Sequence, residues 1–186
     1  DNRGAGQSDR PEGPYTIEQM ANDAMGVLDH LGIKETHVLG FSMGGKIALQ
    51  LALEHSDRIQ KIIFLATSPS WSTKYPPSDR VHKVLESFSN DEQHFAEQYE
   101  ILYADRFKEK FPAKSFVRFK QIEPHPQKEE DFKNQRLATQ SFDVSQRLSE
   151  IKNETLILQG MEDIIARPEN SCLLYTSDAA DDGARE

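Results

Sequence analysis

The octapeptide Val-Leu-Gly-Phe-Ser-Met-Gly-Gly, residues 38–45, joins an apolar run typical of a buried strand to a helical pattern through a Gly-x-Ser-x-Gly motif. The motif predicts a nucleophile elbow, a strand-to-helix turn so sharp that its serine adopts a strained backbone conformation. Glycines are expected at Gly40 and Gly44 because side chains at these two positions would collide. Ser42 is therefore the predicted nucleophile, at a helix N-terminus that favours negative charge, and the Met43 N–H is the predicted oxyanion-hole donor.

Two phosphate-binding interpretations of the same octapeptide are less favoured. A dinucleotide-binding loop needs Gly-x-Gly-x-x-Gly, and the third position of that pattern is occupied here by Ser42. A P-loop is partly matched by Gly40, Gly45 and Lys46, but the next residue is Ile47, which has no hydroxyl for Mg²⁺. A serine nucleophile remains the favoured interpretation.

The composition excludes some classes of function. The 186 residues include 22 basic and 31 acidic ones, a formal net charge of −9, which argues against nucleic acid as a partner. No apolar run is long enough to span a bilayer and the N-terminus does not resemble a signal peptide, so we expect a cytoplasmic protein without a membrane partner. Cys172 is the single cysteine, which rules out an internal disulfide. Nothing in the sequence implies a metal or an organic cofactor.

The apolar residues of the first 68 positions predict alternating helices and strands. Thr16 is the predicted N-cap of the first helix, with Gln19 at the capping-box position and Gly32 as the stop signal. The predicted elements are a helix over 17–31, a strand over 36–39, a helix over 44–54 and a strand over 61–66. This order predicts a parallel sheet with right-handed crossover helices, and the continuous apolar strands predict that both faces of the sheet are covered.

The sequence changes character between residues 69 and 146. This segment holds most of the aromatic residues of the chain, with apolar residues at helical spacing and several prolines as breakers. We therefore predict an α-helical insertion. Most of its aromatic side chains are expected to pack against one another, and some are expected to face the serine and form an apolar pocket.

An acidic residue follows the last predicted strand, at residues 155–159. The strand ends at Gly160, and Asp163 lies in the loop that follows. In hydrolases with the chain order serine, acid, histidine, the acid lies in the turn after a late strand. Asp163 is therefore the predicted catalytic acid, and the neighbouring Glu162 is the residue that could be mistaken for it.

Three ordered motifs together resemble the α/β-hydrolase fold superfamily, in particular small bacterial serine hydrolases such as 3-oxoadipate enol-lactonase-like enzymes, carboxylesterases and perhydrolase-like proteins. Residues 1–9 resemble the family's Asp-x-Arg-Gly-x-Gly-x-Ser-Asp loop, residues 40–45 are similar to its elbow, and Gly160, Asp163 and Pro168 resemble its acid loop. The resemblance covers residues 1–171. It implies an α/β-hydrolase fold with a partial parallel sheet, crossover helices and an inserted α-helical cap.

Two parts of the family pattern are missing from this chain. Members of the family have earlier strands and a His-Gly loop that supplies the second oxyanion-hole N–H, and their catalytic histidine follows the acid. All six histidines of this chain precede Asp163, and none is a credible substitute: His30, His37, His55, His82, His94 and His125. We therefore expect the chain to be a piece of a longer enzyme and to show negligible turnover by itself.

The last fifteen residues form a separate segment in this interpretation. Residues 172–181 resemble the translation of a transposase adapter used in DNA-sequencing libraries and break the helical pattern expected after Ser171. A natural disordered acidic tail is the alternative. The predicted organisation is a first core part at 1–68, a cap at 69–146, a second core part at 147–171 and a non-native or disordered tail at 172–186.

The predicted reaction of the intact enzyme is cleavage of a small-molecule carboxylic ester or lactone through an acyl-enzyme formed on Ser42. Asp163 would orient the histidine, and the Met43 N–H would hold the oxyanion. Three alternatives keep the same residues: hydrolysis of a C–C bond, perhydrolysis, and a non-catalytic ligand-binding protein with an incomplete triad.

Overall fold

The computed structural model describes residues 1–175, and its centre is a parallel sheet of three strands. The strands are β1 (Thr36–Phe41), β2 (Ile59–Leu65) and β3 (Glu154–Leu158), in the order β1-β2-β3. Gly40 pairs with Phe64, and Phe64 pairs with Ile157. The predicted parallel sheet is confirmed, and the predicted strand ends differ from the observed ones by one or two residues. The predicted tail beyond residue 175 lies outside the described residues.

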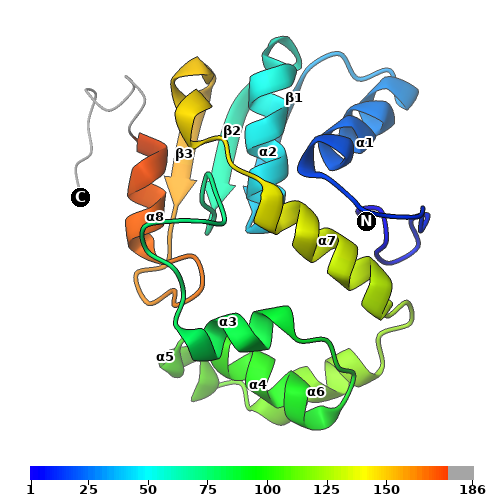
Figure 1. The fold of residues 1–186 in the computed structure, drawn as a ribbon, viewed down its shortest axis with the longest axis vertical. Helices are drawn as coiled ribbons and strands as arrows, with labels where there is room; N and C mark the ends of the chain where they lie inside the picture. The colour runs from blue at the N-terminus through cyan, green and yellow to red at the C-terminus, as the bar shows by residue number, and fades with distance from the viewer. Residues whose placement is uncertain (176–186) are drawn as a thin grey trace.

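Two helices cover one face of the sheet (Figure 1). Helix α2 (Met43–Glu54) packs on β1 and β2, and α1 (Ile17–His30) packs on α2. The capping box predicted for α1 is present, because the Thr16 hydroxyl accepts from the Gln19 N–H and the Gln19 side chain accepts from the Thr16 N–H. The main core lies between these helices and the sheet, with Met20, Leu49 and Ile62 almost fully buried.

The other face of the sheet carries apolar side chains that are open to solvent. Leu39 and Phe41 of β1 are 61% and 60% exposed, and Leu156 of β3 is 51% exposed. The prediction of a sheet covered on both faces is therefore wrong for residues 1–175. The continuous apolar runs were compatible with two covering layers, but α1 and α2 both belong to one layer.

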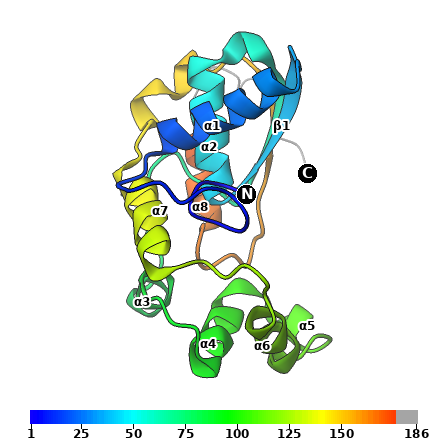
Figure 2. The same ribbon diagram turned by 90° about the vertical axis from the view of Figure 1, so that its right-hand side faces the viewer.

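The segment between β2 and β3 is helical, as predicted. Its helices are α3 (Asp79–Glu86), α4 (Glu92–Leu102), α5 (Asp105–Lys108), α6 (Ala113–Gln121) and α7 (Glu129–Ser141). Helices α3 to α6 lie together beyond one end of the sheet, and α7 leads back towards it (Figures 1 and 2). Ring contacts link the aromatic side chains of α4, α5 and α6, such as Tyr99 with Phe116 at 5.8 Å. This segment overhangs the end of the sheet where the elbow lies.

The remaining elements are short. The 3₁₀ turn η1 (Ser56–Arg58) leads into β2, and η2 (Ser145–Glu150) precedes β3. Helix α8 (Pro168–Cys172) follows the acid loop and continues into η3 (Leu173–Tyr175), whose Leu174 joins the main core. No helix among the described residues is long and apolar enough to cross a membrane.

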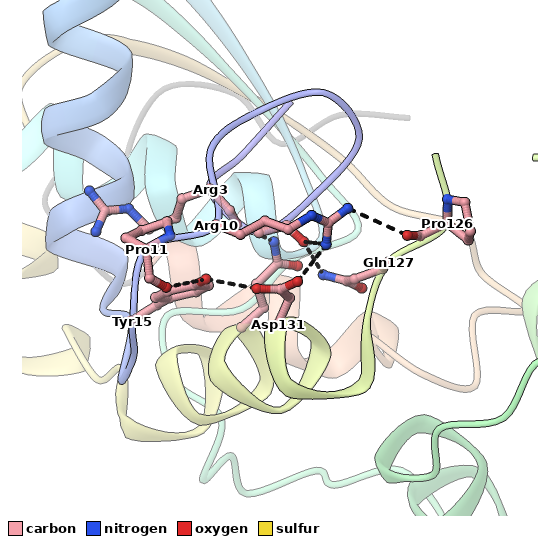
Figure 3. A network of polar contacts seen from close by, with 9 residues as sticks. Arg3, Arg10, Pro11, Tyr15, Pro126, Gln127 and Asp131 are labelled. Carbon is pink, nitrogen blue, oxygen red and sulfur yellow. Dashed lines mark hydrogen bonds and ion pairs between the residues drawn. The ribbon is translucent and has the colours of Figure 1, made fainter. Parts of the chain in front are cut away.

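A partly buried ion pair fastens the N-terminal loop to α7 (Figure 3). Asp131 at the start of α7 is 5% exposed, and it pairs with the Arg10 guanidinium. Arg10 also donates to the Gly4 carbonyl, and the Tyr15 hydroxyl lies 2.9 Å from both Asp131 Oδ1 and the Pro11 carbonyl oxygen. Each oxygen of the Asp131 carboxylate therefore has a partner, and the carboxylate itself is the more buried member of the pair.

Asp131→Asn should lower the free energy of unfolding by about 3 kcal/mol, because it leaves the Arg10 charge without its buried counter-ion. Asp23→Asn is the matched control: Asp23 pairs with Arg3, but its side chain is 44% exposed. Its loss should cost less than about 1 kcal/mol. Urea denaturation of both variants measures the difference in the free energy of unfolding. Equal losses would show that the Arg10–Asp131 pair contributes no more to stability than the more exposed Arg3–Asp23 pair.

Candidate active site

Ser42 occupies a strained backbone position at the junction of β1 and α2. Its φ is 52° and its ψ is −116°, in a region that L-amino acids rarely adopt. Three hydrogen bonds hold this conformation: the Ser42 N–H donates to the Leu65 carbonyl at 3.0 Å, and the Ser42 carbonyl accepts from the Gly45 N–H at 2.9 Å and from Thr67 Oγ1 at 2.8 Å. This is the geometry that the Gly-x-Ser-x-Gly motif predicts.

The glycines of the elbow have different roles from those expected. A Cβ on Gly40 would lie 2.5 Å from the Gly44 carbonyl oxygen and 2.7 Å from Gly45 Cα, so crowding at Gly40 is confirmed. A Cβ on Gly44 would meet nothing within 4 Å, so the steric reason predicted for Gly44 is wrong among the described residues. The crowded neighbour is Gly45, where a Cβ would lie 2.4 Å from Thr67 Cβ. The first turn of α2 therefore packs closely on both Gly40 of β1 and Thr67.

The two glycines make a matched pair of variants. Gly45→Ala should lower the free energy of unfolding by about 3 kcal/mol, because the new methyl group overpacks against Thr67, which is 3% exposed. Gly44→Ala should leave stability unchanged or raise it slightly, since alanine is the better helix former. Thermal denaturation of both variants tests this difference, and the opposite order would contradict the packing described for the elbow.

The polar groups of the elbow are available to a ligand. The Ser42 side chain is exposed and makes no capping hydrogen bond to α2. Within residues 1–175, the Met43 N–H has no acceptor either, because Met43 is the first residue of α2 and lies outside the helical ladder. An exposed hydroxyl and an unused N–H at a helix N-terminus form a place where negative charge on a bound carbonyl oxygen would be stabilised.

Asp163 is held in a fixed orientation in the loop after β3. Its Oδ1 accepts hydrogen bonds from the Ile165 N–H at 2.8 Å and the Ala166 N–H at 2.9 Å. Its Oδ2 accepts from Gln159 Nε2 at 3.2 Å. Glu162, the acid next to it, is exposed. The loop therefore orients one carboxylate, and that carboxylate is the predicted one.

Gln159 was missed by the sequence interpretation. Its amide nitrogen also donates to the Ala166 carbonyl at 2.7 Å, and its oxygen accepts from the Ser171 hydroxyl at 2.6 Å. The side chain thus ties the acid loop to α8. A polar residue at the C-terminal end of an otherwise apolar strand was the signal that could have found it.

Ser42 and Asp163 line the same cavity, which has a volume of about 1070 Å³. The core contributes the elbow and the acid loop, and the helical insertion contributes Leu85 of α3, Ile101 of α4 and Tyr103. A cavity is therefore present under the insertion as predicted, but the insertion also lines it with charged side chains such as Asp105 and Lys108. Of the aromatic residues of the insertion, Tyr103 lines this cavity, while its ring also stacks on Phe107 at 4.6 Å.

All six histidines lie within the described residues, and none lines this cavity. His37 is exposed on β1, His82 contacts the Trp71 ring at 5.7 Å, and the buried His94 hydrogen-bonds Gln98. The described residues also contain no group of three or more His, Cys, Asp or Glu side chains that could hold a metal ion.

Lys46 is a buried cation one turn into α2. It is 4% exposed, and its Nζ donates to the Ser68 carbonyl at 3.0 Å. Burial lowers the pKa of Lys46 to about 8, although the nearby Asp143 carboxylate acts in the opposite direction. In the sequence Lys46 figured only as part of a P-loop pattern, and its burial could not be inferred from that pattern.

The lowered pKa of Lys46 predicts a pH-dependent stability. Below pH 8 the folded state keeps a buried charge that the unfolded state exposes to water, and this penalty is relieved as the pH rises from 8 towards 10.5. Lys46→Met should therefore stabilise the protein at pH 7, and its advantage over the original chain should shrink by about 2 kcal/mol at pH 10. Urea titrations at the two pH values measure the free energy of unfolding of the original chain and of Lys46→Met. Lys61→Met is the control, because Lys61 is exposed. An advantage that does not change with pH would refute the assignment.

Known proteins share this architecture over most of the chain. The alpha/beta hydrolase fold family model matches residues 1–181. The chain is 30% identical to 2-hydroxymuconate semialdehyde hydrolase of Pseudomonas putida, over 87% of this chain and 58% of that protein. It is 40% identical to 3-oxoadipate enol-lactonase 2 of Acinetobacter baylyi over 37% of this chain and 26% of that protein.

A solved structure gives the same result. The enol-lactonase of Burkholderia xenovorans LB400 matches with a TM-score of 0.76 and 26% identity, over 94% of this chain and 65% of that one. The chain thus spans less than two thirds of the length of each of these three proteins. The predicted fold class is confirmed, and the chain belongs to the alpha/beta hydrolase fold family.

Proposed function

We propose that this chain is the part of a serine hydrolase that carries the nucleophile and the acid for cleavage of a carboxylic ester or lactone. The observation that carries the proposal is the strained, exposed Ser42 at the N-terminus of α2, in one cavity with the oriented carboxylate of Asp163. The relatives named as enol-lactonases support a lactone or ester as substrate.

In the proposed reaction, Ser42 Oγ attacks the substrate carbonyl carbon and a histidine takes its proton. The carbonyl oxygen becomes an oxyanion, which the Met43 N–H holds at the helix N-terminus. The alcohol leaves with the proton that the histidine returns, and water then hydrolyses the acyl-serine. Asp163 orients the imidazole and stabilises its cation. Because none of the six histidines lines the cavity, this base is proposed to come from outside residues 1–186.

Hydrolysis of a C–C bond is the second candidate, with the same residues in the same roles. It is favoured by the 30% identity with 2-hydroxymuconate semialdehyde hydrolase over 87% of this chain. The two candidates differ in the leaving group, a carbanion equivalent instead of an alkoxide. A screen in the presence of added imidazole that offers both a phenyl ester and a vinylogous 1,5-diketone distinguishes them by the product formed.

Added imidazole can test the serine mechanism in the chain as it is. Without it, hydrolysis of phenyl butanoate should be negligible, and with imidazole the cavity should accept the missing base and Ser42 should become acylated. Peptide mass spectrometry detects the acyl group on Ser42. Ser42→Ala should remove the acylation, and Asp163→Asn should reduce its rate by about tenfold or more because the imidazole is no longer oriented.

Glu162→Gln is the matched control, because Glu162 is the exposed neighbour of Asp163 and its loss should not change the rate. Equal losses in Glu162→Gln and Asp163→Asn would contradict the assignment of the acid. The other outcome is equal acylation of the original chain and Ser42→Ala, at residues other than Ser42. That result would support a non-catalytic ligand-binding protein instead.

A further inference from the structure

A second, smaller cavity lies against the elbow. Its volume is about 100 Å³, and Ser42 and Met43 line it together with Lys46 of α2, Arg136 of α7 and Asn170 of α8. Ser42 also lines the large cavity, so the nucleophile stands between the two. A group that extends from a carbonyl carbon bound at Ser42 can therefore enter the small cavity while the rest of the ligand occupies the large one.

Two residues on the wall of the small cavity keep polar atoms without a partner. Arg136 Nε and Asn170 Oδ1 are buried and make no hydrogen bond within residues 1–175. The orientation of the Asn170 amide is fixed by its nitrogen, which donates to the Tyr75 carbonyl at 2.8 Å, and Asn170 is 2% exposed. An unsatisfied buried polar atom costs about 1–3 kcal/mol, so a donor and an acceptor left unused beside a cavity indicate a ligand.

The charges around the small cavity are already balanced. The Arg136 guanidinium pairs with Glu86 and stacks over the Trp71 ring at 4.5 Å, and Gln140 donates to the same carboxylate at 2.7 Å. The Lys46 ammonium is opposed by the nearby Asp143 carboxylate. A bound carboxylate would add an uncompensated negative charge, whereas a neutral group would need only one acceptor and one donor.

We propose that the small cavity is a recognition subsite for a hydroxyl group on the acyl part of the substrate. A hydroxyl oxygen accepts from Arg136 Nε, and the hydroxyl proton is donated to Asn170 Oδ1. The volume of about 100 Å³ limits the group to a few non-hydrogen atoms. This inference rests on the proposed function, since it makes the ligand a hydroxyacyl ester or lactone.

Binding can be measured without turnover by nuclear magnetic resonance. The ¹H–¹⁵N signal of Arg136 Nε–H, assigned by its loss in Arg136→Lys, is followed as three methyl esters are added that differ in the group at the end of the acyl chain. Methyl 3-hydroxypropanoate carries the hydroxyl, methyl butanoate has a methyl group in its place, and monomethyl succinate has a carboxylate. The hydroxy ester should shift the signal saturably, with an affinity at least about tenfold higher than the methyl ester, because only it pairs both buried atoms.

Variants at Asn170 test whether its amide oxygen recognises the hydroxyl group. Asn170→Leu should reduce the preference for the hydroxy ester to less than about twofold, whereas Asn170→Gln keeps both the amide donor and the amide acceptor and should retain a clear preference. The binding measurement needs no turnover, so a retained preference for the hydroxy ester together with no acylation of Ser42 would count against the hydrolase proposal and not against the subsite. Equal shifts with the hydroxy and methyl esters, or the strongest binding by monomethyl succinate, would overturn the hydroxyl subsite.

Discussion

The three hydrogen bonds on the Ser42 backbone are the constraint on which the site depends. A non-glycine residue with φ of 52° persists only when its surroundings hold it there, and here the holders come from β2 and from the chain just after it, through the Leu65 carbonyl and the Thr67 hydroxyl. The sheet therefore does more than support the elbow. The pairing of β1 with β2 holds the strained backbone of Ser42 in place. In this backbone conformation the Ser42 hydroxyl is exposed and the Met43 N–H has no acceptor in the described part of the chain.

Ser42 is also the residue at which a large and a small cavity meet. The turn that exposes Ser42 places it between the large cavity under the helical insertion and the small one between α2, α7 and α8. Apolar groups dominate the lining of both cavities. The small cavity differs in that Arg136 and Asn170, which line it, each keep a buried polar atom without a partner among the described residues.

The sequence was sufficient for features that depend on local pattern. The elbow, the acid loop and the capping box of α1 follow from residue types at fixed spacing, and the structure has each of these local geometries. Features that depend on contacts between distant segments were out of reach. The uncovered face of the sheet, the roles of Gln159 and Thr67, and the exchange of steric roles between Gly44 and Gly45 all depend on which segment packs nearby. Apolar periodicity reports that a face is buried, but it does not report by what.

The ion pair of Arg10 and Asp131 has a consequence for the order in which the molecule assembles. Its two members are 121 residues apart, so the pair closes one of the longest loops in the chain. Contacts of such long sequence separation form late, because loop-closure entropy must be offset first. During synthesis on the ribosome, the N-terminal loop and α1 would emerge and settle on α2 before α7 exists. The contact between α7 and the N-terminal loop would form after that, and the cavity over Ser42 would be completed only once β3 and the acid loop, which follow α7 in the chain, are in place.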